Sequence, residues 1–371
     1  MATIPGSPNP DSLDGLDEAD SITGLKGNDT ITAFDGNDTA LGGDGNDSVY
    51  GGLGDDELYG GNGFDLLSSG GGTDSLYGGN DLDTLILDPQ TPGGGSLANG
   101  GEGNDTVSYT ISGANTLNGG GGDDLLNISS GSSSLYFIVD GFDGSVDDGN
   151  LSTISGFERY SAQGADFADI VAFAGRADEF HGAAGADTAF GLGGDDRLYG
   201  DSGGDFLDGG KGEDFLYGGT QNDTLLGSNG DDYIAGGNGS DLINAGAGAD
   251  QVALYLGNDT VTGGSGADRF MFNSNQSGTH HFTDFASDLD RLEFNDILLQ
   301  NGPPVGAIDV GDLSYGAAAG PQAQFVVIFD AVNDLTRLNW DPNGNASSGG
   351  DVRLATFDGD VTILFTDILI T

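Results

Sequence analysis

The sequence predicts an all-β protein built as a parallel β-solenoid, and two observations carry this prediction. The first is a period of nine residues, which repeats ten times without insertion from Gly182 to Met271. The second is the content of each repeat: position six is always aspartate, and position eight is a large apolar residue except at Ala189. A fixed period of this kind is typical of stacked structural repeats. A Gly/Asp-rich disordered linker would not keep the apolar position in register.

Each nonapeptide is expected to form a turn over positions one to six and a short strand over positions seven to nine. The middle strand residue points inward, because strand side chains alternate in direction. Glycines in the turn allow positive φ and a close approach of the backbone to an ion. Two repeats make one coil, so Asp187 and Asp205 are expected to face each other across a coil spacing of about 4.8 Å.

Like charges at that separation repel unless a cation lies between them. Calcium suits such a gap, since it accepts about six to eight oxygens from carboxylates and backbone carbonyls together. The repeat G-G-x-G-x-D-x-U-x, where U is apolar, resembles the nonapeptide of the RTX family of secreted bacterial proteins. The resemblance implies a right-handed parallel β-roll that binds many calcium ions. The candidate calcium ligands of this block are Asp187, Asp196, Asp205, Asp214, Asp223, Asp232, Asp241, Asp250, Asp259 and Asp268.

The charge balance is strongly acidic, with a net charge of −51 and only nine Lys and Arg among 371 residues. Nucleic acids and anionic membrane surfaces are poor partners for such a field. Self-repulsion opposes compaction when cations are absent, so we expect the calcium-free chain to be largely unfolded. Cysteine is absent, and bound metal ions can stabilise an extracellular fold in place of disulfides.

The sequence predicts an exported protein and no membrane span. No run of eighteen apolar residues occurs, so no membrane span is expected. The first six residues have neither a basic region nor an apolar core and do not form a Sec signal. The RTX resemblance implies type I secretion through an uncleaved C-terminal signal, and hence a secreted, extracellular or cell-surface protein.

A first repeat block is predicted over residues 15–86, after a short lead-in or cap at residues 1–14. Its first nonapeptide has Glu18 where glycine is usual, which suits a terminal repeat. The candidate ligands of this block are Asp20, Asp29, Asp38, Asp47, Asp56, Asp65, Asp74 and Asp83.

Residues 87–181 are expected to continue the solenoid with longer or calcium-poor coils. The register breaks at 87–98, which contains two prolines. This segment is either a linker between domains or, as we favour, a loop that projects from a continuous solenoid. Isolated repeats supply Asp105 and Asp124 as candidate ligands, and Asp169 and Asp178 are in phase with the later block as weaker ones.

Residues 272–371 resemble the C-terminal region of RTX proteins, which caps the roll and carries the secretion signal; an ordinary β-rich cap is the alternative. One loop in this region spaces Asp341, Asn343 and Asn345 like the first ligands of an EF-hand. The glycine and the final glutamate of an EF-hand are missing there, so a plain Asx-type turn remains the alternative.

Catalytic motifs are not expected. Ser202 lies in a Gly-Asp-Ser-Gly-Gly segment, but that segment is also positions one to five of a nonapeptide. No H-E-x-x-H metalloprotease motif occurs. His280 and His281 are adjacent, so they cannot both face one ion, and a surface or packing role is expected.

Two classes of function therefore remain. The first is a calcium-binding structural protein that folds and self-assembles outside the cell, as a subunit of a surface layer, filament or matrix. Its partners would be calcium and further copies of the chain, joined head to tail. The second is a calcium-dependent adhesive or carbohydrate-binding module with a surface polysaccharide as partner. Tyr50, Tyr59, Tyr77, Tyr199 and Tyr217 form an outward aromatic row that is either a binding surface or simply packed.

Overall fold

The computed structural model is all-β, and the residues that it describes contain no helix. It describes residues 2–88, 95–110, 115–129, 136–139, 146–147, 153–155, 157–173, 175–273, 278–286, 289–294, 313–315, 324–330, 335–341, 352–358 and 368–370. The chain divides into two compact units, Met1–Phe180 (unit 1) and His181–Thr371 (unit 2).

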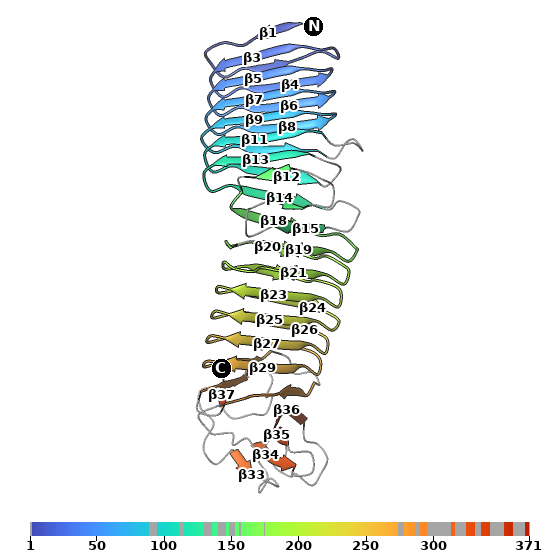
Figure 1. The fold of residues 1–371 in the computed structure, drawn as a ribbon, viewed down its shortest axis with the longest axis vertical. Coiled ribbons are helices and arrows are strands. Elements are labelled where there is room, and N and C mark those ends of the chain that lie inside the picture. Colours follow the sequence, from blue (N-terminus) through green and yellow to red (C-terminus); the bar gives the residue numbers. More distant parts are fainter. Residues whose placement is uncertain are drawn as a thin grey trace. The chain divides into compact units, whose positions relative to one another are not determined.

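Unit 1 contains two long parallel sheets, and the chain alternates between them (Figure 1). The first sheet consists of β1 (Thr3–Pro5), β3 (Ser21–Lys26), β5 (Thr39–Asp44), β7 (Glu57–Asn62), β9 (Ser75–Asn80), β11 (Leu97–Glu102), β13 (Thr116–Gly121) and β17 (Thr153–Ser155), in that order. The second consists of β2 (Ser12–Asp14), β4 (Thr30–Asp35), β6 (Ser48–Leu53), β8 (Leu66–Gly71), β10 (Thr84–Leu87), β12 (Thr106–Thr110), β14 (Leu125–Ser129) and β18 (Arg159–Gln163). β15 (Tyr136–Val139) pairs with β16 (Val146–Asp147) and with β19 (Ile170–Ala172).

Unit 2 repeats this arrangement, and β20 (Glu179–His181) contains the boundary between the units. One sheet consists of β22 (Arg197–Tyr199), β24 (Phe215–Thr220), β26 (Tyr233–Asn238), β28 (Gln251–Leu254), β30 (Arg269–Phe272), β32 (Arg291–Phe294) and β37 (Ile368–Ile370). The other consists of β21 (Thr188–Phe190), β23 (Phe206–Lys211), β25 (Thr224–Asn229), β27 (Leu242–Ala247), β29 (Thr260–Ser265), β31 (His280–Phe282), β36 (Val352–Asp358), β35 (Leu335–Asp341), β34 (Gln324–Asp330) and β33 (Leu313–Tyr315).

The C-terminal part of unit 2 departs from the parallel pattern. β34 pairs with β35 and β35 with β36 in antiparallel register, while β36 continues the parallel sheet beside β31. This arrangement agrees with the predicted β-rich C-terminal region. None of the described residues forms a helix that is long and apolar enough to cross a membrane.

The strand register confirms that two nonapeptides make one coil. Ser21 pairs with Thr39 in unit 1, and Phe206 pairs with Thr224 in unit 2. The break at residues 87–98 does not interrupt the sheets, because β9 pairs with β11 and β10 with β12 on either side of it.

The strands are longer than the three residues expected from the repeat. β5, for example, runs through positions seven to nine and continues over positions one to three of the next repeat. Position one is a second inward position, and Gly42 occupies it in β5. A Cβ on Gly42 would overlap the carboxylate of Asp47 and lie 2.7 Å from the carbonyl oxygen of Gly60. Because glycine has no Cβ, the backbone can stay extended at this close approach.

The core consists of two columns of residues from position eight in each unit. Leu58, Leu67 and Leu76 in unit 1, like Leu216 and its counterparts in unit 2, are 0% exposed. Each fully buried leucine contributes about 1.5–3 kcal/mol relative to an exposed one. Each side chain contacts the same position of the neighbouring coils, so stability comes from nearest-neighbour contacts.

The turns depend on positive φ at positions two and four. Most of these residues are glycine, such as Gly219 with φ +112°. Several are not, including Leu25, Phe34 and Leu192, whose φ values lie between 67° and 85°. An L-residue in this region costs roughly 1–2 kcal/mol, so the turns of these coils are held by the pairing of their neighbours.

Replacing Gly219 by alanine should lower the melting temperature, because φ is +112° there and the new Cβ would overlap the carbonyl oxygen of Asp201. Gly175→Ala is the matched control, since nothing lies within 4 Å of its added Cβ. Thermal unfolding followed by circular dichroism would compare the two. Equal melting temperatures for both variants would contradict this account of the turns.

Candidate metal sites

The aspartates at position six are buried in both units, although water solvates an ionised carboxylate strongly. Each one named above in the two repeat blocks, and Asp105 and Asp124 as well, is 3% exposed or less. Each lies at the end of a turn, immediately before the next strand, so the repeat itself places it. An ionised group without a partner costs several kcal/mol to bury, so these carboxylates need compensation.

One carboxylate oxygen, Oδ1, is held by the neighbouring coil. The backbone N–H of Asp187 donates to Oδ1 of Asp205 at 2.8 Å, and the N–H of Asp47 donates to Oδ1 of Asp65 at 2.8 Å. The same bond recurs with a spacing of 18 residues along each side of the roll. Aspartates two repeats apart therefore do face each other, as the sequence predicts.

The other oxygen, Oδ2, has no hydrogen-bond partner at most of these aspartates. It is buried and unpartnered, among the described residues, at Asp29, Asp38, Asp47, Asp56, Asp65, Asp83, Asp105, Asp124, Asp205, Asp214, Asp223, Asp232, Asp241, Asp250 and Asp268. Buried polar atoms are almost always paired in native proteins, so rows of orphaned carboxylate oxygens indicate binding sites for cations.

Backbone carbonyls point to the same places as the orphaned oxygens. A Cβ added to Gly200 would overlap Oδ2 of Asp205 and would lie 2.7 Å from the carbonyl oxygen of Gly218 in the next coil. The same pair of atoms crowds Gly218, with Asp223 and Gly236 as its neighbours. Glycine at position one thus lets a carboxylate and a carbonyl from successive coils approach each other.

The protonation of these carboxyls reflects the same burial. Burial, together with the nearby carboxylates of Asp65 and Asp105, raises the pKa of Asp83 to about 8. The N–H of Asp65 acts in the opposite direction. Burial likewise raises the pKa to about 7 at Asp56, Asp65 and Asp223. It raises the pKa to about 6 at Asp74, Asp105, Asp205, Asp214, Asp232, Asp241, Asp250 and Asp268. Without a cation, the rows would bind protons near neutral pH.

The donor set fits calcium. No group of three or more His, Cys, Asp or Glu side chains that could hold a metal occurs among the described residues. A cation in these rows must therefore complete its shell with backbone carbonyls beside single carboxylates. Calcium accepts such mixed oxygen shells, whereas zinc prefers nitrogen and sulfur ligands.

Several aspects of the rows escaped the sequence analysis. Asp11 lies in the segment expected to be a lead-in, yet its N–H donates to Oδ1 of Asp29 at 2.7 Å, as in a regular coil. Its position nine residues before Asp20 was a signal that could have revealed it. Glu158 accepts the N–H of Asp124 at 2.9 Å, and Asp290 accepts that of Asp268 at 3.1 Å.

Elsewhere, neutral residues continue the ladder of hydrogen bonds. The N–H of Asp74 donates to the hydroxyl of Ser96 at 3.0 Å, and the N–H of Ser96 donates to Oδ1 of Asn115 at 2.9 Å. The ladder thus persists in unit 1 without a carboxylate. The nine-residue period does not predict Ser96 or Asn115 as members of the ladder, because longer connections precede both residues and break the spacing.

The remaining candidate ligands are less well placed. Asp169 and Asp178 are buried, and Oδ2 of Asp169 accepts the N–H of Ala165 at 3.0 Å. Asp341 ends β35, and nothing is described of its side chain. Asn343 and Asn345 lie outside the described residues.

The two adjacent histidines face opposite sides of β31, as strand alternation predicts. His280 is 5% exposed, and its Nδ1 lies 2.8 Å from Oδ2 of Asp259. His281 is half-buried on the outer side and contacts Thr356 and Asp358. His280 is therefore a buried partner of a repeat aspartate rather than a surface residue.

The outward aromatic residues stack on one another. The rings of Tyr59 and Tyr77 have centroids 4.8 Å apart with planes 10° apart, and His181 and Tyr199 have centroids 4.4 Å apart with planes 3° apart. A sugar ring that stacks on an aromatic residue needs a free ring face. Rings that cover each other's faces favour the packing interpretation of this row.

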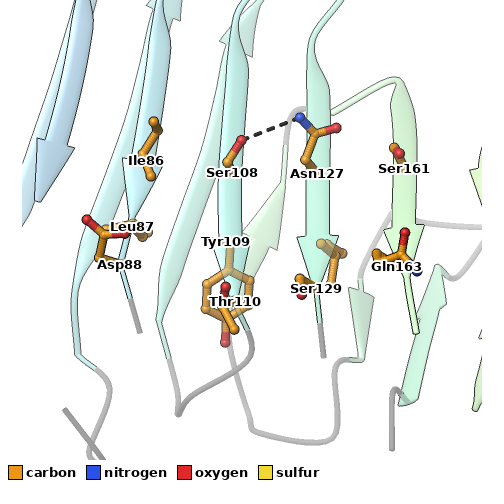
Figure 2. A pocket seen from close by; sticks show the side chains of 11 residues that line it. Ile86, Leu87, Asp88, Ser108, Tyr109, Thr110, Asn127, Ser129, Ser161 and Gln163 are labelled. Atoms are coloured by element: carbon orange, nitrogen blue, oxygen red, sulfur yellow. Dashed lines mark hydrogen bonds between the residues drawn. The ribbon is translucent and has the colours of Figure 1, made fainter. Parts of the chain in front are cut away.

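A shallow cavity of about 240 Å³ lies on the outer side of β10, β12, β14 and β18 (Figure 2). Its polar lining is mostly neutral, and Nδ2 of Asn127 donates to the hydroxyl of Ser108 at 3.4 Å. Asp88 supplies a carboxylate to this lining, and its Oδ2 accepts a hydrogen bond from the hydroxyl of Ser68 at 3.2 Å. Among the described residues, the lining contains no histidine, lysine or second carboxylate that could form an acid–base pair with it.

The sequence has no significant match among curated proteins. Among solved structures, it is similar to the solution structure of the AlgE6R3 subunit from the Azotobacter vinelandii mannuronan C5-epimerase, at 24% identity. The similarity has a TM-score of 0.29 and covers 40% of this chain and 78% of the other.

The sequence profile of the RTX calcium-binding nonapeptide repeat, which describes four copies, matches the chain at many places. The matched residues, more than half of the chain, are 6–39, 14–49, 32–67, 50–85, 109–135, 181–216, 217–252 and 255–274. These ranges contain most of the buried aspartates described above. The chain belongs to the family of proteins with RTX calcium-binding nonapeptide repeats.

Proposed function

We propose that this protein is a secreted structural protein that folds on binding calcium and self-assembles outside the cell, as a subunit of a surface layer, filament or matrix. Calcium binding is supported chiefly by the rows of buried carboxylate oxygens that have no hydrogen-bond partner. Membership of a calcium-binding repeat family supports it further.

The proposed ligands are the position-six aspartates with an orphaned Oδ2, together with carbonyl oxygens of the neighbouring turns. Bound calcium would supply positive charge between carboxylates of successive coils. The chain itself contributes the rest: the N–H of one aspartate orients the next carboxylate, and position-one glycine keeps the space beside it free. Binding free energy is then folding free energy, since the unfolded chain has no preformed site.

The acidic composition supports folding after export. A chain with a net charge of −51 repels itself until cations neutralise it. Where calcium is scarce, as inside a cell, such a chain would stay unfolded and suitable for a secretion channel. Outside, calcium would fold it.

Self-assembly is supported by the edge strand at the start of unit 1. β1 pairs with β3 on one side and has no partner on its other side among the described residues. An open strand edge is a template for pairing with another chain. A head-to-tail contact through such an edge does not close on itself and propagates into a filament or sheet.

Calcium should drive folding. Chelator-treated protein is expected to show a disordered circular dichroism spectrum, which becomes β-type on addition of millimolar calcium, because neutralised carboxylates can then be buried. Magnesium should substitute poorly, since it requires small octahedral sites and dehydrates reluctantly. The same β content with and without calcium would contradict the proposal.

The metal-free protein should become more stable on acidification. The pKa of the repeat carboxyls given above with raised values is about 6 to 8 in the fold, against a usual value of 3.8. The folded state therefore binds more protons between these values, and its stability falls as pH rises through that range. In chelator, β content should increase as pH is lowered from about 8 to 5. A decrease would show that protons do not replace the missing cations.

Assembly should depend on both calcium and β1. Large oligomers are expected in calcium by light scattering and electron microscopy, and they should dissolve in chelator. Ile4→Lys places a charge in the edge strand and should abolish them. Asn9→Lys adds the same charge in an exposed turn and serves as the control. A protein that stays monomeric at high concentration in calcium would favour the adhesive or carbohydrate-binding module instead.

A further inference from the structure

Some position-six aspartates differ from the rest, because the protein itself supplies a partner for Oδ2. Oδ2 of Asp20 accepts the N–H of Leu16 at 2.8 Å, and Oδ2 of Asp290 accepts the N–H of Ala286 at 2.7 Å. Oδ2 of Asp11 accepts the N–H of Ser7 at 2.5 Å. In all three cases the donor is four residues earlier in the same turn.

Two further aspartates receive a side-chain partner. Nδ1 of His280 lies 2.8 Å from Oδ2 of Asp259, and both residues are buried. Ser69, which stands where most repeats have glycine, is close enough to Asp74 for its hydroxyl to lower the pKa of that carboxyl against the effect of burial. We call this set the row-end aspartates, namely Asp11, Asp20, Asp74, Asp259 and Asp290.

Every member of this set lies at an end of a row. Asp11 and Asp20 are the first aspartates on the two sides of unit 1. Asp74 is the last before the neutral residue Ser96. In unit 2, Asp290 follows Asp268 at the end of one row, and Asp259 is followed by His280 at the end of the other.

The backbone explains how self-capping becomes possible at Asp11, Asp20 and Asp290. In most interior turns, position two lies inside a strand that pairs on both sides; Gly43, for example, pairs with Leu25 and with Gly61. Ser7, Leu16 and Ala286 lie outside the strands. Their N–H groups are therefore available to the carboxylate of their own turn.

We propose that the row-end aspartates hold no calcium, and that each closes a row of calcium sites with a partner from the protein in place of the ion. This inference rests on the proposed calcium binding. A calcium ion between coils draws oxygens from two successive turns, and at the end of a row the neighbouring turn is absent or lacks a carboxylate. The carboxylate there would be left with an incomplete site. A backbone N–H, a hydroxyl or an imidazole compensates its charge instead.

The test counts the calcium ions bound by the full-length protein, by equilibrium dialysis with calcium alone and by native mass spectrometry. Asp290→Asn should leave the number of bound ions unchanged, whereas Asp268→Asn, the preceding residue of the same row, should remove at least one. Asp259→Asn and Asp241→Asn form the same comparison on the other side of unit 2. Asp20→Asn and Asp38→Asn repeat it in unit 1.

Circular dichroism in saturating calcium would identify any variant that fails to fold. The inference is then tested on the two remaining pairs of row-end and interior variants. Loss of bound calcium in a folded row-end variant, as large as in its interior counterpart, would overturn the inference and leave calcium binding itself intact. If the unaltered protein bound no calcium, the proposed function would fail instead. The two failures are thus distinguishable.

Discussion

The constraint on which the rest of the structure depends is the burial of rows of carboxylates with one oxygen unpartnered. A single orphaned carboxylate would cost several kcal/mol, and here the same arrangement repeats along each side of both units. Neither the apolar columns nor the backbone pairing removes this cost. A hard cation between the carboxylates would, which is why we propose that folding of this chain depends on calcium.

The glycine at position one and the aspartate at position six of each repeat depend on each other sterically. The carboxylate occupies the space where a Cβ on the position-one residue would lie, and a carbonyl of the next coil approaches the same place. Oδ1 is oriented by an N–H of the adjacent coil, so each turn prepares the site of its neighbour. A change at one position therefore affects the coils on either side more than the rest of the solenoid.

The same motif residue can serve two purposes, depending on its neighbours. Interior aspartates such as Asp214 and Asp232 keep Oδ2 free, whereas row-end aspartates such as Asp20 and Asp290 satisfy it locally. This difference lets charged rows terminate without an exposed metal site or an uncompensated buried charge. It also explains why a buried imidazole, His280, follows the last aspartate of one row.

The nonapeptide period by itself determined the coil of two repeats, the apolar columns and the facing aspartates, because these follow from strand alternation and a fixed spacing. Only the tertiary structure decided features that depend on contacts between coils. The strands extend over positions one to three because glycine fits beside the next coil's carbonyl. Asp11, Glu158 and Asp290 join the rows although two of them are out of phase. The partner of Asp259 comes from a strand beyond the repeats. No local pattern encodes which atoms remain unpartnered once neighbouring coils have packed, and that distinction separates a metal ligand from a row end.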